Sequence, residues 1–184
     1  MTDNKGIFFI ADTHFNDKNI IHYTRRPFKS LVDMDEQLII NWNGVVDNSD
    51  TVFVLGDFFS GSSKSDFRYM CYLMKHLNGN KILIMGNHDE FAYHKYLSAG
   101  FMEVYRYPII YRDYMMLSHY PLYISGDTPY VNIFGHVHAN PIYTDLTTHS
   151  MCVSVERSLM DYRPISYEDV VSLMKSERVK IGMD

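Results

Sequence analysis

The sequence is poor in features that mark several classes of protein. Its 184 residues include only two cysteines, Cys71 and Cys152, and these have no metal-ligand spacing. Two isolated thiols make no disulfide framework, so a reducing, cytoplasmic location is expected. No run approaches the ~18 consecutive apolar residues of a membrane-spanning helix. The apolar run 6–11 is short and ends at Asp12, which is unlike a signal peptide. The sequence therefore predicts no membrane partner.

A surplus of basic residues is also missing. The formal net charge is −5 with the histidines neutral, whereas nonspecific binding to nucleic acid usually requires a basic face. We therefore expect no broad nonspecific nucleic-acid binding. Apolar residues make up 46% of the chain, which is enough for a sizeable core. The composition leaves the oligomeric state open.

Short apolar runs rich in β-branched and aromatic residues predict buried strands. Apolar residues at helical spacing predict three helices, one of which has Ser63 and Asp66 spaced as a capping box and Gly79 in the position of a C-cap. This order predicts an α/β fold with mixed sheets, in a single domain over residues 1–184 without a cap domain. The predicted strands are 6–11, 51–55, 81–85, 114–118, 130–134 and 151–155; the helices are 33–46, 63–79 and 166–176; and 101–118 reads as a hairpin turning near Arg112-Asp113.

Polar side chains directly follow five of the predicted strands. In open α/β sheets, ligands bind just beyond the carboxyl ends of the strands, so these side chains are expected to meet in one place. Five of the nine histidines lie at such positions. The segments are Asp12-Thr13-His14, Gly56-Asp57, Gly86-Asn87-His88-Asp89, His119 and Gly135-His136-Val137-His138.

Each of these segments alone has an ordinary structural explanation, since Asp-x-His and Gly-Asp often form turns and a single histidine is commonly a surface or core residue. Together they favour a metal site. Carboxylate, imidazole and amide donors without thiolate suit Mn, Fe, Zn, Co or Ni. The donors outnumber those that one tetrahedral ion needs, which indicates two ions that share a carboxylate, as in two-metal hydrolases.

The ordered set from Asp12 to His138 resembles the calcineurin-like metallophosphoesterase family. The segments DTHFNDKNIIHYTRRPF and VSVE…DYRPIS are similar to its small single-domain members from bacteria and phages. The resemblance implies two packed mixed β-sheets flanked by helices, in four αββα layers. The chain departs from these members at Asn16-Asp17, where they often carry Gly-His, and at Cys152, where many carry Asn.

The resemblance also implies roles for individual residues and a cofactor of two divalent ions, with Mn²⁺ as the first choice. His88 would act on the leaving oxygen or on charge at the phosphoryl group, and Asp89 would orient His88 or the structure near it. A hydroxide bridging the ions would attack the phosphorus of a phosphodiester, such as a nucleotide or a cyclic nucleotide. The implied ligands are Asp12, His14 and His138 for the first ion, Asn87, His119 and His136 for the second, and Asp57 between them.

Substrate contacts are less defined by the sequence. Arg25 and Arg26 follow the first motif, and the fork of an arginine matches the geometry of a phosphate. Arg26 is the predicted contact, with a solvated loop in which Pro27 fixes a turn as the alternative. Ten of the 15 tyrosines lie between Tyr93 and Tyr143; most are expected to fill strands, and a few could stack on a substrate ring.

Two other functions stay open at this point. Some proteins of this fold bind other proteins with little catalysis, but they typically lose ligands or the motif histidine, whereas this chain keeps all of them. The other alternative is a nuclease that acts on short oligonucleotides or on ends, because an acidic and short chain argues against a long nucleic-acid groove.

Overall fold

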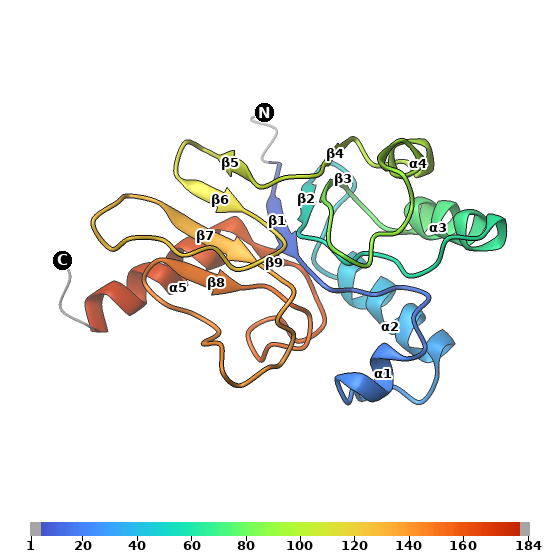
Figure 1. The fold of residues 1–184 in the computed structure, drawn as a ribbon, viewed down its shortest axis with the longest axis horizontal. Helices are drawn as coiled ribbons and strands as arrows, with labels where there is room; N and C mark the ends of the chain where they lie inside the picture. The colour runs from blue at the N-terminus through green and yellow to red at the C-terminus, as the bar shows by residue number, and fades with distance from the viewer. Residues whose placement is uncertain (1–4, 181–184) are drawn as a thin grey trace.

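Two mixed β-sheets form the centre of the molecule, and Figure 1 shows helices on both sides of them. The computed structural model describes residues 5–180. The helices α2 (Leu31–Asn43), α3 (Lys64–His76) and α4 (Tyr93–Ala99) gather on one side of the five-stranded sheet, and the four-stranded sheet lies on the other side of β1 (Ile7–Ile10) (Figure 1). This arrangement confirms the predicted class, an α/β fold of two mixed sheets flanked by helices.

The first sheet has the order β4-β3-β2-β1-β9. Its strands β1 to β4 are parallel, and β9 is antiparallel to β1. The central strands are buried almost throughout, which explains their nearly continuous apolar sequences. The strands are β1 (Ile7–Ile10), β2 (Thr51–Val54), β3 (Asn80–Ile84), β4 (Glu103–Tyr105) and β9 (Ile165–Ser166).

The second sheet has the order β5-β6-β7-β8. Here β6, β7 and β8 are parallel and β5 is antiparallel to β6. The sheets meet just after β1 and β8, where the amide of Ala11 donates to Val153 O at 2.9 Å and the amide of Val155 donates to Ala11 O at 3.1 Å. The carboxyl ends of strands from both sheets therefore face the same region. The strands are β5 (Ile109–Tyr111), β6 (Met115–Leu117), β7 (Val131–Phe134) and β8 (Ser150–Cys152).

Helices α2 and α3 begin at serine N-caps and bury one face. Ser30 caps α2 by accepting from the amide of Asp33, and the predicted capping box of Ser63 and Asp66 is present at the start of α3. No helix within residues 5–180 has both the length and the apolar character needed to cross a membrane. The helices are α1 (Ile20–Tyr23), α2 (Leu31–Asn43), α3 (Lys64–His76), α4 (Tyr93–Ala99) and α5 (Tyr167–Lys180).

Two local predictions differ from the structure. The helix predicted over 63–79 ends at His76 with Leu77 as its C-cap in an extended conformation, so Gly79 is not the cap. Gly79 instead has φ +81° just before β3, where an added Cβ would lie 2.9 Å from a methyl group of Val46. Glycine is therefore needed at position 79 for the turn into β3 and not for the end of α3.

The hairpin predicted over 101–118 is only half correct. Arg112 and Asp113 do lie in its turn, the three-residue loop 112–114 between β5 and β6, with φ values of 51° and 64°. The earlier part of the segment, β4, pairs in parallel with β3 of the other sheet. Local sequence pattern indicates a strand but does not select its partner, because pairing is decided by long-range packing.

Candidate metal centre

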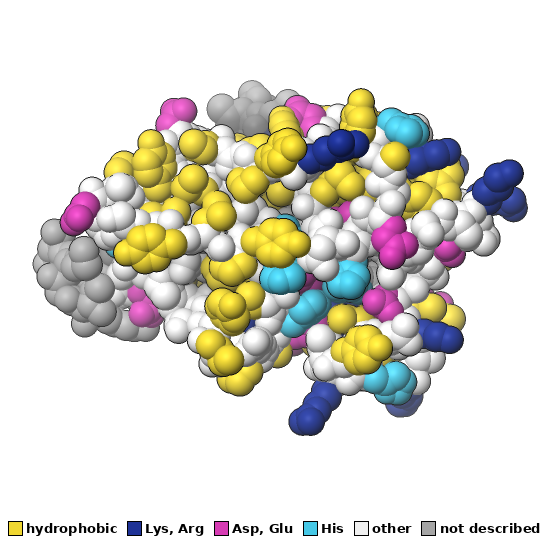
Figure 2. Space-filling view, viewed as in Figure 1, with side chains coloured by type: hydrophobic (Ala, Val, Ile, Leu, Met, Phe, Trp, Pro, Cys, Tyr) yellow, Lys and Arg dark blue, Asp and Glu magenta, His cyan; other side chains and the backbone are white. Residues whose placement is uncertain are grey.

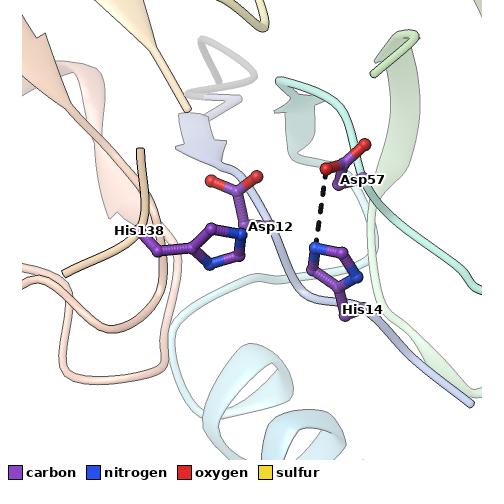
Figure 3. Close-up of side chains that lie close together, drawn as sticks. All are labelled: Asp12, His14, Asp57 and His138. Carbon is purple, nitrogen blue, oxygen red and sulfur yellow. Dashed lines mark ion pairs between the residues drawn. The ribbon is translucent and has the colours of Figure 1, made fainter. Parts of the chain in front are cut away.

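The carboxyl ends of β1, β2 and β7 bring four predicted ligand residues together. Each contributes one ligand atom, and these atoms all lie within 4.8 Å of one another. The Nε2 atom of His14 is 3.5 Å from Oδ2 of Asp57. Figure 3 shows the four side chains reaching into one space from different segments of the chain. The residues of this first cluster are Asp12, His14, Asp57 and His138.

Asp57 also belongs to a second cluster, with His119 and His136. The Nε2 atom of His119 lies 3.4 Å from Asp57 Oδ2, 3.2 Å from His136 Nδ1 and 2.9 Å from Asn87 Oδ1. The other ring nitrogen of His119 is 2.9 Å from the backbone oxygen of Leu55, so Nε2 is the atom that faces the cluster. All seven predicted ligand residues therefore come together in two adjoining groups that share Asp57.

The backbone around these clusters is unusual. Five of the predicted ligand residues have positive φ angles between 46° and 70°. A residue with a side chain adopts this left-handed region at a cost of about 1–3 kcal/mol, and such residues concentrate at functional sites. The strained residues lie in the turns that directly follow β1, β2 and β7, where the chain must change direction within two or three residues. They are Asp12, His14, Asp57, His136 and His138.

Two glycines allow the ligand-bearing turns to approach one another. A Cβ atom on Gly86 would lie 2.2 Å from Asp57 Oδ1. A Cβ atom on Gly135 would lie 2.5 Å from the Cβ of Ala11 and 2.8 Å from Asp12 Oδ2. All three distances are shorter than a real side chain allows, so glycine at these positions lets the turns pack this closely.

The donor set fits divalent metal ions. His14 is buried, and neither of its ring nitrogens has a hydrogen-bond partner among residues 5–180. Burial raises the pKa of Asp12, although His138 and His119 act against this shift. Burial also acts to raise the pKa of Asp57, but His14 and His119 outweigh it and lower that pKa to about 2. A cation among these atoms would give Nε2 of His14 a partner and offset the desolvation of the two carboxylates.

His88 and Asp89 follow β3 but have different surroundings. The imidazole of His88 is exposed, and its ring centre lies 5.3 Å from that of His14. The carboxylate of Asp89 is buried and accepts from the backbone amides of Gly86, Asp57 and Phe58 at 2.7, 2.9 and 3.0 Å. Asp89 therefore fixes the turn that carries Asp57. Among residues 5–180 its carboxylate makes no hydrogen bond to the ring of His88, so its contacts support the structure near His88 and not the imidazole itself.

A comparison with known families agrees with this geometry. The model of the calcineurin-like phosphoesterases matches residues 6–181. The chain belongs to the calcineurin-like phosphoesterase family. An uncharacterised protein of Methanocaldococcus jannaschii is 35% identical over 184 residues, which cover 95% of this chain and 94% of the archaeal protein. The gene 66 protein of Mycobacterium phage L5 is 34% identical over 82 residues, 45% of this chain and 39% of its own.

Solved structures share the fold of this phosphoesterase. A protein of unknown function from Aquifex aeolicus has a TM-score of 0.69 and 30% identity, and the match covers 92% of this chain and all of that one (100%). The nuclease MPE of Pseudomonas putida has a TM-score of 0.51 and 20% identity, with 72% of this chain and 61% of that chain covered.

Arg26 does not lie where the prediction needs it. Only 4% of this residue is exposed. Its guanidinium donates to Glu156 Oε1 at 2.6 and 2.9 Å and to the backbone oxygens of Asp12 and Thr13 at 2.7 and 2.8 Å. Because its guanidinium is buried and bonded to these partners, Arg26 is not available to bind a substrate. The predicted contact between Arg26 and substrate was therefore wrong, and the residue instead braces the turn that carries Asp12 and Thr13.

Sequence reasoning missed three residues that support the ligands. Glu156 Oε1 lies 3.0 Å from His138 Nδ1, Ser154 donates to Asp12 Oδ2 at 2.5 Å, and Asp17 Oδ2 is 3.4 Å from His14 Nδ1. Ser154 and Glu156 lie at the end of the run 151–155, as the ligands lie at the ends of other strands. Their positions at a strand end are therefore a local signal by which Ser154 and Glu156 could have been found.

Glu156→Gln should weaken Mn²⁺ binding by about 10- to 100-fold, the usual effect of losing a carboxylate behind a ligating histidine. Burial acts to raise the pKa of Glu156, but His138 and Arg26 outweigh it and lower that pKa to about 2, so the group is a carboxylate at neutral pH. Calorimetric titration of the metal-free protein measures the effect.

Asp35→Asn is the matched control, because Asp35 is also a buried carboxylate. It accepts from the hydroxyl of Tyr69 at 2.8 Å and from the amide of Asn16, and among residues 5–180 it makes no hydrogen bond to a predicted ligand residue. Equal Mn²⁺ affinities for the two variants would contradict the supporting role of Glu156.

Proposed function

We propose that this phosphoesterase hydrolyses a phosphodiester at a centre of two divalent ions. The observation that carries the proposal is the sharing of Asp57 by two adjoining clusters of ligand atoms. Asp12, His14 and His138 would complete the site of one ion, and Asn87, His119 and His136 that of the other. Adjacent ions that share a carboxylate are the arrangement of two-metal hydrolases.

The donor atoms favour Mn²⁺, with Fe, Zn, Co or Ni as alternatives, because imidazole and carboxylate are present without thiolate. When bound, such ions supply positive charge opposite the phosphoryl oxygens and make water more acidic. Burial raises the pKa of Asp12 and so disfavours its ionised form. A cation bound beside Asp12 would offset this effect.

His88 is the proposed proton donor to the leaving oxygen. Its imidazole is exposed at the mouth of the first cluster and has room to turn toward a substrate. Its backbone is held in place, because its amide donates to Asp57 Oδ1 at 2.8 Å. Asp89 acts as a positioning residue for the turns that carry Asp57 and His88.

A diester is favoured over a monoester because the mouth of the site is open. Asn87 and His88 are both exposed, so the two ester substituents of a bound diester would have space to extend into solvent. We also propose that the protein works in the cytoplasm, which agrees with its two free thiols, Cys71 and Cys152.

The test is an assay of protein stripped of metal and reloaded with Mn²⁺, using bis-p-nitrophenyl phosphate beside p-nitrophenyl phosphate. We expect hydrolysis that needs the metal, with the diester preferred. Mn²⁺ should also raise the melting temperature, since an ion at 100 times its Kd stabilises a protein by about 2.7 kcal/mol.

The outcomes separate the alternatives. Binding of two ions without hydrolysis of any diester would favour a noncatalytic interaction module on the same fold. Absence of metal binding would contradict the proposed centre altogether.

A further inference from the structure

A cleft of about 350 Å³ adjoins the candidate metal centre at His138. The end of α1 and the residues after it, Tyr23 to Arg25, form one wall, and the turn 137–140 forms the other. This volume is within the lower part of the range for small-molecule sites. Figure 2 shows exposed histidines on one face of the molecule, with Lys and Arg side chains at the margins of the same face.

Arg25 offers this cleft a free positive charge. Its side chain is exposed, and its guanidinium makes no hydrogen bond or ion pair within residues 5–180. The next residue differs in both respects, because Arg26 is buried and its guanidinium donates to Glu156 and to backbone oxygens. Of the two neighbouring arginines, one braces the metal centre and the other is left open beside it.

The backbone of Arg25 adopts a conformation that favours glycine. Arg25 has φ 55° and follows Thr24, the C-cap of α1. The next amide, of Arg26, donates back to Ile21 O at 2.9 Å. This hydrogen bond identifies the position after the cap in a Schellman motif, where glycine is strongly preferred because it carries no side chain into the left-handed region. An arginine here costs conformational energy.

Both walls of the cleft are fixed relative to the metal centre. Glu156 Oε1 contacts Arg26 behind one wall and His138 in the other, at 2.6 and 3.0 Å. The buried guanidinium of Arg157 donates to the backbone oxygens of Asn140 and Tyr143 at 3.1 and 3.0 Å, which holds the turn 137–140. The position of Arg25 beside His138 is therefore built into the fold.

We propose that this cleft binds a second phosphate of the substrate, the one next to the scissile phosphodiester, with Arg25 as its partner. This inference rests on the proposed function and names its substrate class: a nucleotide chain that carries a further phosphate. An arginine fork pairs with phosphate oxygens, and the ring of Tyr23, a residue that is 80% exposed, gives a base a surface for stacking. A terminal phosphate and an internucleotide phosphate could both pair with Arg25 in this way.

Three chromogenic esters test the proposal. The p-nitrophenyl ester of thymidine 5′-phosphate has only the scissile phosphate, its 3′-phosphorylated form adds a terminal phosphate, and the ester extended by a 3′-linked thymidine adds an internucleotide phosphate. The measured quantity is the ratio of kcat/KM for each longer ester to kcat/KM for the first. We expect the Mn²⁺-loaded protein to prefer at least one longer ester, and the preferred ester identifies the source of the phosphate.

Arg25→Gly is the decisive variant, because glycine suits the left-handed backbone and keeps the turn intact. It should reduce the preference by about 10-fold, the lower end of the effect of a hydrogen bond to a charged group. Arg25→Lys should reduce it less. Arg68→Ala removes an exposed arginine from α3 with the same change in net charge and should leave the preference as it was. Added salt should weaken the preference of the unmodified protein.

A preference that survives in Arg25→Gly, or its absence from the unmodified protein, would overturn the proposal. The proposed function fails separately, if none of the esters and no bis-p-nitrophenyl phosphate is hydrolysed. In that event the cleft is tested by binding of thymidine 3′,5′-bisphosphate to the Mn²⁺-loaded protein, which Arg25→Gly should weaken by a similar factor.

Discussion

Asp57→Asn should lower kcat for phosphodiester cleavage by more than about 100-fold while the chain stays folded. Asp57 is the residue that belongs to both clusters, so its amide would remove a carboxylate from two ions at once. Mutation of a residue that only hydrogen-bonds to a metal ligand typically lowers metal affinity or activity by about 10- to 100-fold. Loss of a ligand shared by two ions should lower activity by at least that much. The measurement is kcat for bis-p-nitrophenyl phosphate at saturating Mn²⁺.

The fold should survive this change because the amide keeps the shape of the carboxylate. Its Oδ1 atom still accepts from the amide of His88, as Asp57 Oδ1 does at 2.8 Å. The melting temperature of the metal-free variant checks this point, and Asp35→Asn serves as a second carboxylate-to-amide control. Full activity in Asp57→Asn, or two ions bound at unchanged affinity, would show that the two clusters do not share this ligand.

His88→Ala should lower kcat by about 10²- to 10⁴-fold, the range for loss of a general acid. Mn²⁺ binding should be unchanged, because the ring of His88 is exposed and His88 belongs to neither cluster. A group that protonates the leaving oxygen matters most when that oxygen is strongly basic. The loss should therefore be larger for an ester with an alcohol or nucleoside leaving group than for one that releases p-nitrophenolate.

The comparison of leaving groups distinguishes proton donation from the other role considered for His88, which is to stabilise charge on the phosphoryl group. That role would give the same loss for both kinds of ester. Unchanged kcat for both would remove His88 from the reaction. Asn87 provides the contrast within the same turn, since Asn87→Ala should weaken Mn²⁺ binding as well as kcat.

The positions of the ligands could be predicted from the sequence because the signal is local. Each apolar run identifies a strand, and the residue after it lies at the strand's end whichever neighbour the strand takes. Asp12, Asp57 and His119 could therefore be expected at a common edge before their pairing was known. The error at β4 had no effect on this argument, since a strand in the wrong sheet still ends at the same residue.

Partners far apart in the chain could not be predicted in this way. The contact that removes Arg26 from the surface comes from Glu156, which is 130 residues away in sequence. Nothing near Arg26 distinguishes it from Arg25, and only the packed structure separates the buried arginine from the free one. The strain at Arg25 was equally hidden, because left-handed backbone at a position favoured by glycine is visible only once the helix end is known.

The origin of the ligands has a consequence for the order in which the protein assembles. Each cluster takes ligands from both sheets: Asp57 comes from the first, while His119, His136 and His138 come from the second. A chain that has formed only its first sheet holds an incomplete site for either ion. Contacts between segments so distant in sequence form late in folding, because closing long loops is costly in chain entropy. Metal ions bound here would therefore act as cross-links between the sheets, and their uptake would mark the completion of folding.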